Sequence, residues 1–212
     1  MNAMTDVPAV PIAFKRNARE ALADPQLRRN FRGAMDFLMD KRRVQFPDGD
    51  ELERLRAFGN RVRARALSKL PELLERLDAN LSRNGVKVHW AETVEEANAI
   101  VHRIVEQHAA KKVIKGKSMV SEEMEMNHYL GERGVDCLES DMGEFIVQLR
   151  EEKPSHIIMP AIHLNVGQVA SLFHDKLEVD YTEDVDRLIQ IGRETLRRNF
   201  FEADIGVSGV NF

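Results

Sequence analysis

The chain of 212 residues has a single cysteine and no long apolar run. Because Cys137 stands alone, this chain by itself cannot form an internal disulfide, a four-cysteine iron–sulfur site or a four-cysteine zinc site. Apolar runs such as residues 145–147 and 157–159 are far shorter than the ~20 residues that a membrane-spanning helix needs, and no charged-then-apolar leader opens the sequence. We therefore expect a cytoplasmic protein without a membrane span.

Aromatic residues are also few, at 6% of the chain, and most of them are phenylalanine. They do not interleave with basic residues as a base-stacking platform requires. The net charge is −4, and the arginines of the first 80 residues alternate with acids along helical sequence, which is typical of a solvated helix surface. These features argue against a nucleic-acid partner.

The first 84 residues predict helices only. An apolar stripe at three- and four-residue steps indicates a helix over residues 52–70. A proline at its start and an Asn-Gly pair at its end frame another helix over residues 71–84. Residues 18–44 predict one or two more helices, with Pro25 at a start. We assign residues 1–84 to a helical N-terminal segment.

Beyond residue 84, strand patterns alternate with helix patterns. Helices are predicted to begin near Thr93, Ser121, Asp141, Gln168 and Glu183. Such alternation favours parallel strands joined by crossovers, so we expect residues 85–212 to form an α/β domain with a Rossmann-like, mostly parallel sheet that is incomplete at the C-terminus. The predicted strands are residues 86–91, 112–115, 135–138 and 157–161, with the glycine-rich start of another at 205–212.

The most unusual segment is KGKSMVSEE, residues 115–123, which joins a predicted strand end to a helix start. Ligands bind at this edge of an open parallel sheet, and a helix N-terminus offers free N–H groups to an anion, to which Lys115 and Lys117 would add charge. A nucleotide-hydrolysing phosphate loop is not expected, because Lys111 stands where its first glycine is needed. Local chemistry leaves two interpretations open: an anion site, or serine helix caps beside solvated lysines.

His163 and Asn165 follow the fourth predicted strand, residues 157–161, and are expected on the same sheet edge as Lys117. This position makes them candidates for a ligand site, although a lone histidine is more often structural. Glu125 and His128 have the Glu-x-x-His spacing of di-iron helix bundles, but the chain holds no second copy, so we expect no metal site. A serine hydrolase is disfavoured as well, because the sequence lacks a Gly-x-Ser-x-Gly elbow.

Several segments in order resemble the lactate utilization protein B family. They are Lys117–Glu123, Glu139–Ile146, Pro154–Ile158, Pro160–His163 and Gly206–Phe212. The resemblance covers nearly the whole chain and implies a LUD domain, an α/β fold akin to the sugar-phosphate isomerase and CoA-transferase group. It also implies that full-length relatives carry two [4Fe–4S] clusters in a later cysteine-rich region. Those relatives work with two other lactate-utilization subunits in the cytoplasm to oxidise L-lactate to pyruvate.

The resemblance and the position in the sheet together give a set of candidate ligand-binding residues. A small carboxylate or phosphate would suit two lysines and a helix N-terminus. We expect no cofactor held by these residues, a role in assembly, and self-association through apolar surface. The alternative function is a self-contained isomerase or transferase that binds a sugar phosphate or an acyl-CoA. The set is Lys115, Lys117, Ser118 and Ser121 on the loop, with Glu122, Glu144, His163 and Asn165 as polar neighbours.

Overall fold

The computed structural model describes residues 13–152, 154–155 and 159–209. The chain divides into two compact units, each with its own core. One unit holds the described residues up to Met39 together with Asp141–Arg197, and the other holds Asp40–Ser140 together with the described residues from Arg198 on. The boundary between residues 84 and 85 stays a prediction.

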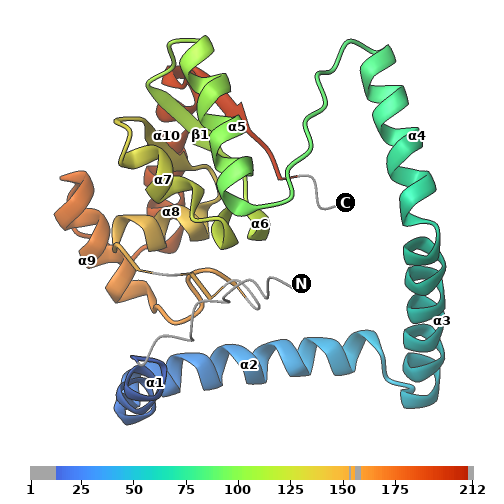
Figure 1. The fold of residues 1–212 in the computed structure, drawn as a ribbon. Helices are drawn as coiled ribbons and strands as arrows, with labels where there is room; N and C mark the ends of the chain where they lie inside the picture. The colour runs from blue at the N-terminus through green and yellow to red at the C-terminus, as the bar shows by residue number, and fades with distance from the viewer. Residues whose placement is uncertain (1–12, 153, 156–158, 210–212) are drawn as a thin grey trace. The chain divides into compact units, whose positions relative to one another are not determined.

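The N-terminal part is helical, as the sequence predicts. Its four helices are α1 (Ala13–Ala23), α2 (Pro25–Gln45), α3 (Gly49–Ser68) and α4 (Leu70–Arg83) (Figure 1). The carboxylate of Asp48 accepts hydrogen bonds from the first backbone N–H groups of α3, and Pro71 occupies the first turn of α4. Helices α2, α3 and α4 contain no buried residue.

A small open sheet of three parallel strands confirms the α/β expectation (Figure 1). Strand β1 (Lys112–Lys115) lies in the middle, between β2 (Asp136–Glu139) and β3 (Ile205–Val207). Lys115 pairs with Glu139 on one side and with Val207 on the other. Both neighbours run parallel to β1, which is the arrangement that helical crossovers produce.

Besides α3 and α4, the unit that contains the sheet holds the helices α5 (Val94–Gln107), α6 (Met119–Glu123) and α7 (Met126–Gly131). Helix α7 packs against β2 and against α5. The core between them contains Val105, Val113 and Leu130, each at most 2% exposed. Val113 anchors β1 in this core, and the candidate loop leaves from the carboxyl end of the strand.

The other unit contains α8 (Met142–Leu149), α9 (Val166–Leu177) and the larger part of α10 (Val185–Glu202). The rings of Phe145 and Phe173 meet with centroids 6.5 Å apart in its core. Gly192 lets α10 pass close to α8, since a Cβ there would lie 2.5 Å from the sulfur of Met142. No helix in the described ranges combines the length and the apolarity that crossing a membrane demands.

Three sequence predictions differ from the structure. Residues 86–91 form no strand, because alternation alone gives no ladder without a neighbouring strand to pair with. The helix predicted over 121–130 is divided into α6 and α7 by Glu125, whose φ of 49° is left-handed, while Asn98 donates a hydrogen bond to the carbonyl of Met124. Of the strand predicted over 157–161, residues 157 and 158 lie outside the described residues, and 159–161 form no strand.

Candidate functional site

The carboxyl end of β1 is the point at which the strand order of the sheet reverses. The chain goes from β1 to β2 on one side and later reaches β3 on the other. In open α/β sheets, ligands bind outside the carboxyl ends of the strands at such a point. The loop from Lys115 to Ser118 occupies this position, and the hydroxyl of Ser118 caps α6 by accepting from the backbone N–H of Ser121 at 3.3 Å.

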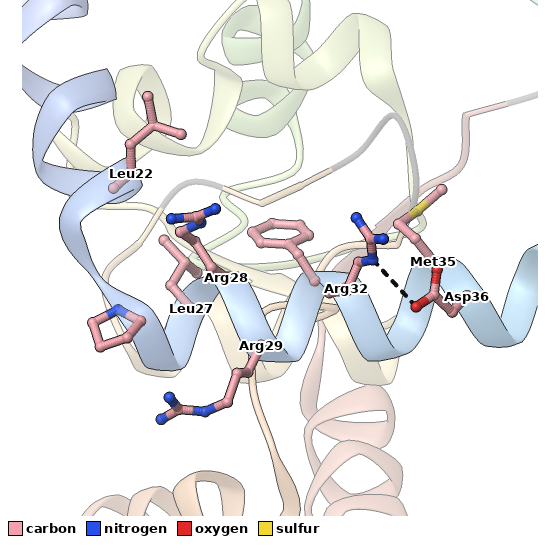
Figure 2. Close-up of a pocket in the computed structure, with 10 residues that line it drawn as sticks. Leu22, Leu27, Arg28, Arg29, Arg32, Met35 and Asp36 are labelled. Carbon is pink, nitrogen blue, oxygen red and sulfur yellow. Dashed lines mark hydrogen bonds and ion pairs between the residues drawn. The ribbon is translucent and has the colours of Figure 1, made fainter.

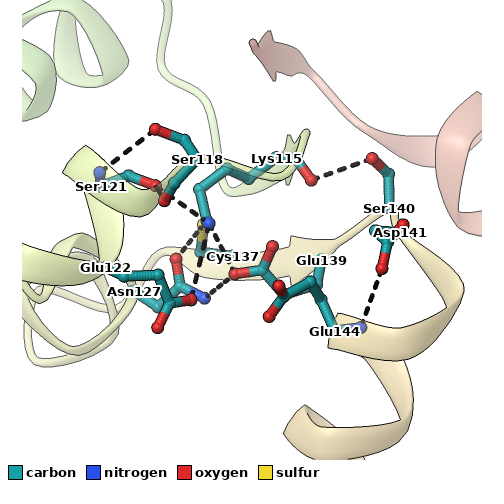
Figure 3. A network of polar contacts seen from close by, with 10 residues as sticks. All are labelled: Lys115, Ser118, Ser121, Glu122, Asn127, Cys137, Glu139, Ser140, Asp141 and Glu144. Carbon is teal, nitrogen blue, oxygen red and sulfur yellow. Dashed lines mark hydrogen bonds and ion pairs between the residues drawn. The ribbon is translucent and has the colours of Figure 1, made fainter. Parts of the chain in front are cut away.

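Lys115 turns its ammonium group inward at the base of this loop (Figure 3). The side chain is 1% exposed, and its Nζ lies 2.7 Å from Oε1 of Glu139. It also donates a hydrogen bond to the hydroxyl of Ser121 at 3.0 Å and lies 3.9 Å from Oε1 of Glu122. A charge this deeply buried is tolerated only when it is paired and hydrogen-bonded, as it is here.

The cluster continues from Glu139 along β2 and onto α7 (Figure 3). The side-chain amide of Asn127 donates to Oε1 of Glu139 at 2.7 Å, and the thiol of Cys137 donates to Oδ1 of Asn127 at 3.3 Å. Burial, with a further contribution from the charge of Glu139, raises the pKa of Cys137 to about 12. The thiol is therefore protonated and unreactive at neutral pH.

Within this cluster the positive charge of Lys115 is matched by carboxylates of the chain itself. Lys117 differs: it is exposed, and it has no ion-pair partner in the part of the chain that the structure describes. The strand β3 lines one side of the same loop, because the N–H of Gly116 donates to the carbonyl of Val207 at 2.7 Å. Lys117 is thus an exposed cation on this loop.

Gly209 follows β3 and lies against the loop. A Cβ at this position would come within 2.4 Å of the Cβ of Ser118, a separation that real side chains essentially never show. Glycine is required here because two backbones approach each other closely. The sequence prediction that a strand begins in the last glycine-rich residues is confirmed for Ile205–Val207. The prediction did not include the pairing of this strand with β1.

His163 lies in the other unit, where its ring is held on both sides. Its Nε2 is 2.8 Å from Oε2 of Glu152, and the ring stacks on Phe31 with centroids 6.4 Å apart. Burial disfavours the charge of Glu152, but hydrogen bonds from Arg150 and His163 outweigh it and lower the pKa of that carboxyl. The Nδ1 atom of His163 is buried and meets no hydrogen-bond partner among the described residues.

Asn165 and Glu144 serve helix ends in that same unit. The side-chain oxygen of Asn165 accepts from the N–H of Gln168 at 2.9 Å, and the Gln168 side chain accepts from the N–H of Asn165 at 3.0 Å, which completes a capping box for α9. Glu144 is 2% exposed in the first turn of α8, and its N–H donates to Asp141. The capping already accounts for the side chain of Asn165.

Comparison with known proteins places this chain in a family. The family model described as the LUD domain matches residues 74–212. This chain belongs to the LUD domain family. Among curated proteins it is similar to Lactate utilization protein B of Bacillus pumilus (strain SAFR-032), with 38% identity over 201 residues that make up 94% of this chain and 42% of the relative. The same-named protein of Bacillus subtilis (strain 168) is 33% identical over the same shares.

A third relative, Lactate utilization protein B of Bacillus cereus (strain B4264), is 42% identical over 166 residues, which are 77% of this chain and 35% of the relative. The chain spans about two fifths of the length of the curated relatives that it matches first. No solved structure matches it.

All eight predicted site residues lie within the LUD domain match, and the structure divides them into two groups. It brings Lys115, Ser118, Ser121 and Glu122 together, with Lys117 exposed beside them, and it places Glu144, His163 and Asn165 in the other unit. No group of three or more His, Cys, Asp or Glu in the described ranges could hold a metal ion.

Sequence reasoning missed the contributions of Glu139, Asn127 and Cys137 to the buried cluster. One signal was available, since Lys115 and Glu139 are opposite charges at the ends of two apolar strands. Only the observed register, in which they are paired residues, shows that one charge neutralises the other.

A cavity of about 760 Å³ lies outside the LUD domain match, along α1 and α2 (Figure 2). It is lined by Leu27, Phe31 and Met35, which recur at four-residue steps along α2, and by Arg28 and Arg32. Arg32 is paired with Asp36 at 3.3 Å. None of the predicted site residues lines this cavity.

Proposed function

We propose that this chain acts in lactate utilization, as the LUD domain part of a cytoplasmic protein that oxidises L-lactate to pyruvate, and that it binds a small carboxylate at the carboxyl end of β1. The observation that carries the first half is the similarity to relatives named Lactate utilization protein B over 94% of the chain. Lactate is a small monocarboxylate, and a carboxylate needs a cation with hydrogen-bond donors close by.

The loop after β1 supports the second half of the proposal. Lys117 is the exposed cation at the point where the strand order reverses. The sequence position of Lys115 suggests contact with a ligand, but its ammonium group is paired with Glu139 and so connects β1 to β2. This ion pair stabilises the strand end from which the loop leaves. Lys117 therefore contacts the carboxylate, and Lys115 positions the loop that carries Lys117.

The electron-transfer part of the reaction belongs, in this proposal, to residues other than these. Two [4Fe–4S] clusters need eight ligands, typically cysteines, and this chain has one cysteine, which is buried. Partnership with two other lactate-utilization subunits is part of the same proposal, with this chain contributing to assembly. The purified chain is expected to be colourless, and an iron–sulfur absorption band with stoichiometric iron would contradict this division of roles.

Thermal unfolding with candidate ligands tests the proposal. L-lactate and pyruvate are expected to raise the unfolding temperature, because a ligand at 100 times its dissociation constant adds ~2.7 kcal/mol to the stability of the state that binds it. Chloride at the same concentration and ionic strength controls for unspecific anion effects. A shift with a sugar phosphate or with CoA, and none with lactate or pyruvate, would favour the isomerase or transferase alternative instead.

A further inference from the structure

Helix α3 carries an apolar stripe that nothing in its own unit buries. Leu55, Phe58 and Val62 recur on one face and are 46%, 58% and 53% exposed, and the helix has no buried residue. Helices in proteins obtain most of their stability from packing such a face against another element. A contiguous exposed apolar stripe of this kind marks an interaction surface.

The charges beside the stripe indicate what packs there. Glu51 lies in the first turn of α3, while Arg61, Arg63 and Arg65 lie in its second half, where residues 61–68 include no acid. Glu51 and Arg65 are about four turns apart at 3.6 residues per turn, so both flank the stripe on the same side of the helix. Arg65 has no ion-pair partner among the residues described, so its charge is available to a partner.

We propose that α3 is the contact surface of a homodimer, in which α3 of a second copy packs antiparallel to it about a two-fold axis near Phe58. Glu51 and Arg65 are equally far from Phe58 on either side. The two-fold axis therefore places Glu51 of each copy beside Arg65 of the other, twice in one interface, while the two apolar stripes fill the space between the helices.

The charge pattern selects this orientation and this partner. A parallel pair would bring Arg65 of one copy against Arg65 of the other, and like charges at a helix interface are repulsive. In the antiparallel pair the helix is complementary to itself, so a second copy of the chain meets the requirement without a partner of another sequence. Helix α3 is separate in sequence from the loop after β1, so a monomeric chain could still bind lactate and would leave the proposed function untouched.

Sedimentation equilibrium of the full 212-residue chain over a range of concentrations tests the dimer. The unchanged chain is expected to dimerise, and Glu51→Arg or Arg65→Glu alone is expected to weaken the dimer roughly tenfold or more, because each places two pairs of like charges in the interface. The two changes combined in one chain restore opposite charges across the interface and are expected to restore dimerisation.

Glu53→Arg is the matched control. Glu53 is paired with Arg56 at 2.9 Å, as Glu51 is with Arg54 at 3.0 Å, but it lies on the side of the helix opposite the stripe. Its charge reversal is expected to leave the dimer unchanged. A chain that is monomeric at every concentration, a control that weakens the dimer as much as Glu51→Arg, or a combined variant without recovery would each overturn the proposal.

Disulfide trapping gives a second readout that does not depend on the charge variants. In a Cys137→Ala background, Phe58→Cys is expected to form a cross-linked dimer on mild oxidation, because position 58 lies at the axis. Glu53→Cys is expected not to do so. Equal cross-linking at the two positions would rule out the proposed packing even if the chain is dimeric.

Discussion

Lys115 and Glu139 form an ion pair that solvent hardly reaches, with exposed fractions of 1% and 2%. Moving two charges out of water is costly, and their attraction repays that cost only while both are present and hydrogen-bonded. Asn127 and Ser121 supply the additional hydrogen bonds. The pair thus connects β1 to β2, and the sequence around Lys115 alone does not reveal this role.

Lys115→Met is expected to lower the free energy of unfolding by about 3–5 kcal/mol, because it leaves the carboxylate of Glu139 buried without its ammonium partner. Urea denaturation monitored by circular dichroism measures the loss. Lys112→Met removes the pair with Glu202, whose side chains are 49% and 48% exposed, and is expected to cost far less because solvent screens that pair. Equal losses in the two variants would contradict the buried-pair account.

Cys137 gives the folded protein a distinct pH dependence. Its pKa rises from the ordinary 9.0 to about 12 on folding, mainly because of burial, so the folded state holds the proton more tightly than the unfolded state. Below pH 9 both states keep the proton and stability is unaffected. Between pH 9 and 12 the unfolded state loses it first, so stability falls as the pH rises, by at most about 1.4 kcal/mol per pH unit.

The Cys137→Ala variant lacks this proton and is expected to lose stability less steeply over the same range. Unfolding free energies of both proteins, measured from pH 8 to pH 10.5, provide the comparison. The same burial is expected to slow alkylation of the native thiol by iodoacetamide relative to the urea-unfolded chain. Identical pH slopes for the two proteins would show that the thiol is not protected as the structure indicates.

Among the features of the secondary structure, the first residues of the helices were predicted best from local sequence. Capping residues act on the backbone within three positions, so Asp141 and Thr93 begin α8 and α5 as their spacing indicates. Tertiary contacts decided what local spacing could not. At the break between α6 and α7, Asn98 of α5 donates a hydrogen bond to the carbonyl of Met124, and residues 86–91 form no strand because no partner strand adjoins them.

Asn165 was assigned to a ligand site from its position in the sequence, but its side chain caps the start of α9. Asn165→Ala is expected to cost about 1 kcal/mol of stability through loss of the capping box of α9, whereas Asn165→Asp keeps a side-chain oxygen and is expected to be close to neutral. Thermal denaturation of both variants checks this. A loss of lactate binding in the Asn165→Asp variant with unchanged stability would instead indicate contact with the ligand.

For the molecule as a whole, the sequence predicted the α/β class and the LUD family, both of which are confirmed. The periodicity of apolar residues indicates the fold class because it is a property of each segment alone. The site was predictable only in part. Lys117 and Ser118 could be placed at a strand end, but the neutralisation of Lys115 by Glu139 and the close passage of Gly209 arise between segments far apart in the chain.

At Gly209 an added methyl group would disturb the packing between the residues after β3 and the loop after β1. Gly209→Ala is expected to destabilise the chain by about 1–3 kcal/mol, because the added methyl group would overlap Ser118 and separate the loop from the residues after β3. Gly206→Ala, where the space around the Cβ position is open, is the matched control and is expected to cost less. Comparable losses for the two variants, from denaturation midpoints, would contradict the close approach.

The central claim is that the loop after β1 binds a small carboxylate through Lys117. Calorimetric titration of L-lactate into the unchanged chain, Lys117→Ala and Lys111→Ala tests it most directly, since Lys111 is an exposed lysine at the opposite end of β1. The account predicts binding that Lys117→Ala weakens tenfold or more, by loss of a charge-assisted hydrogen bond, and that Lys111→Ala leaves unchanged. No binding to the unchanged chain, or equal weakening in the two variants, would contradict it.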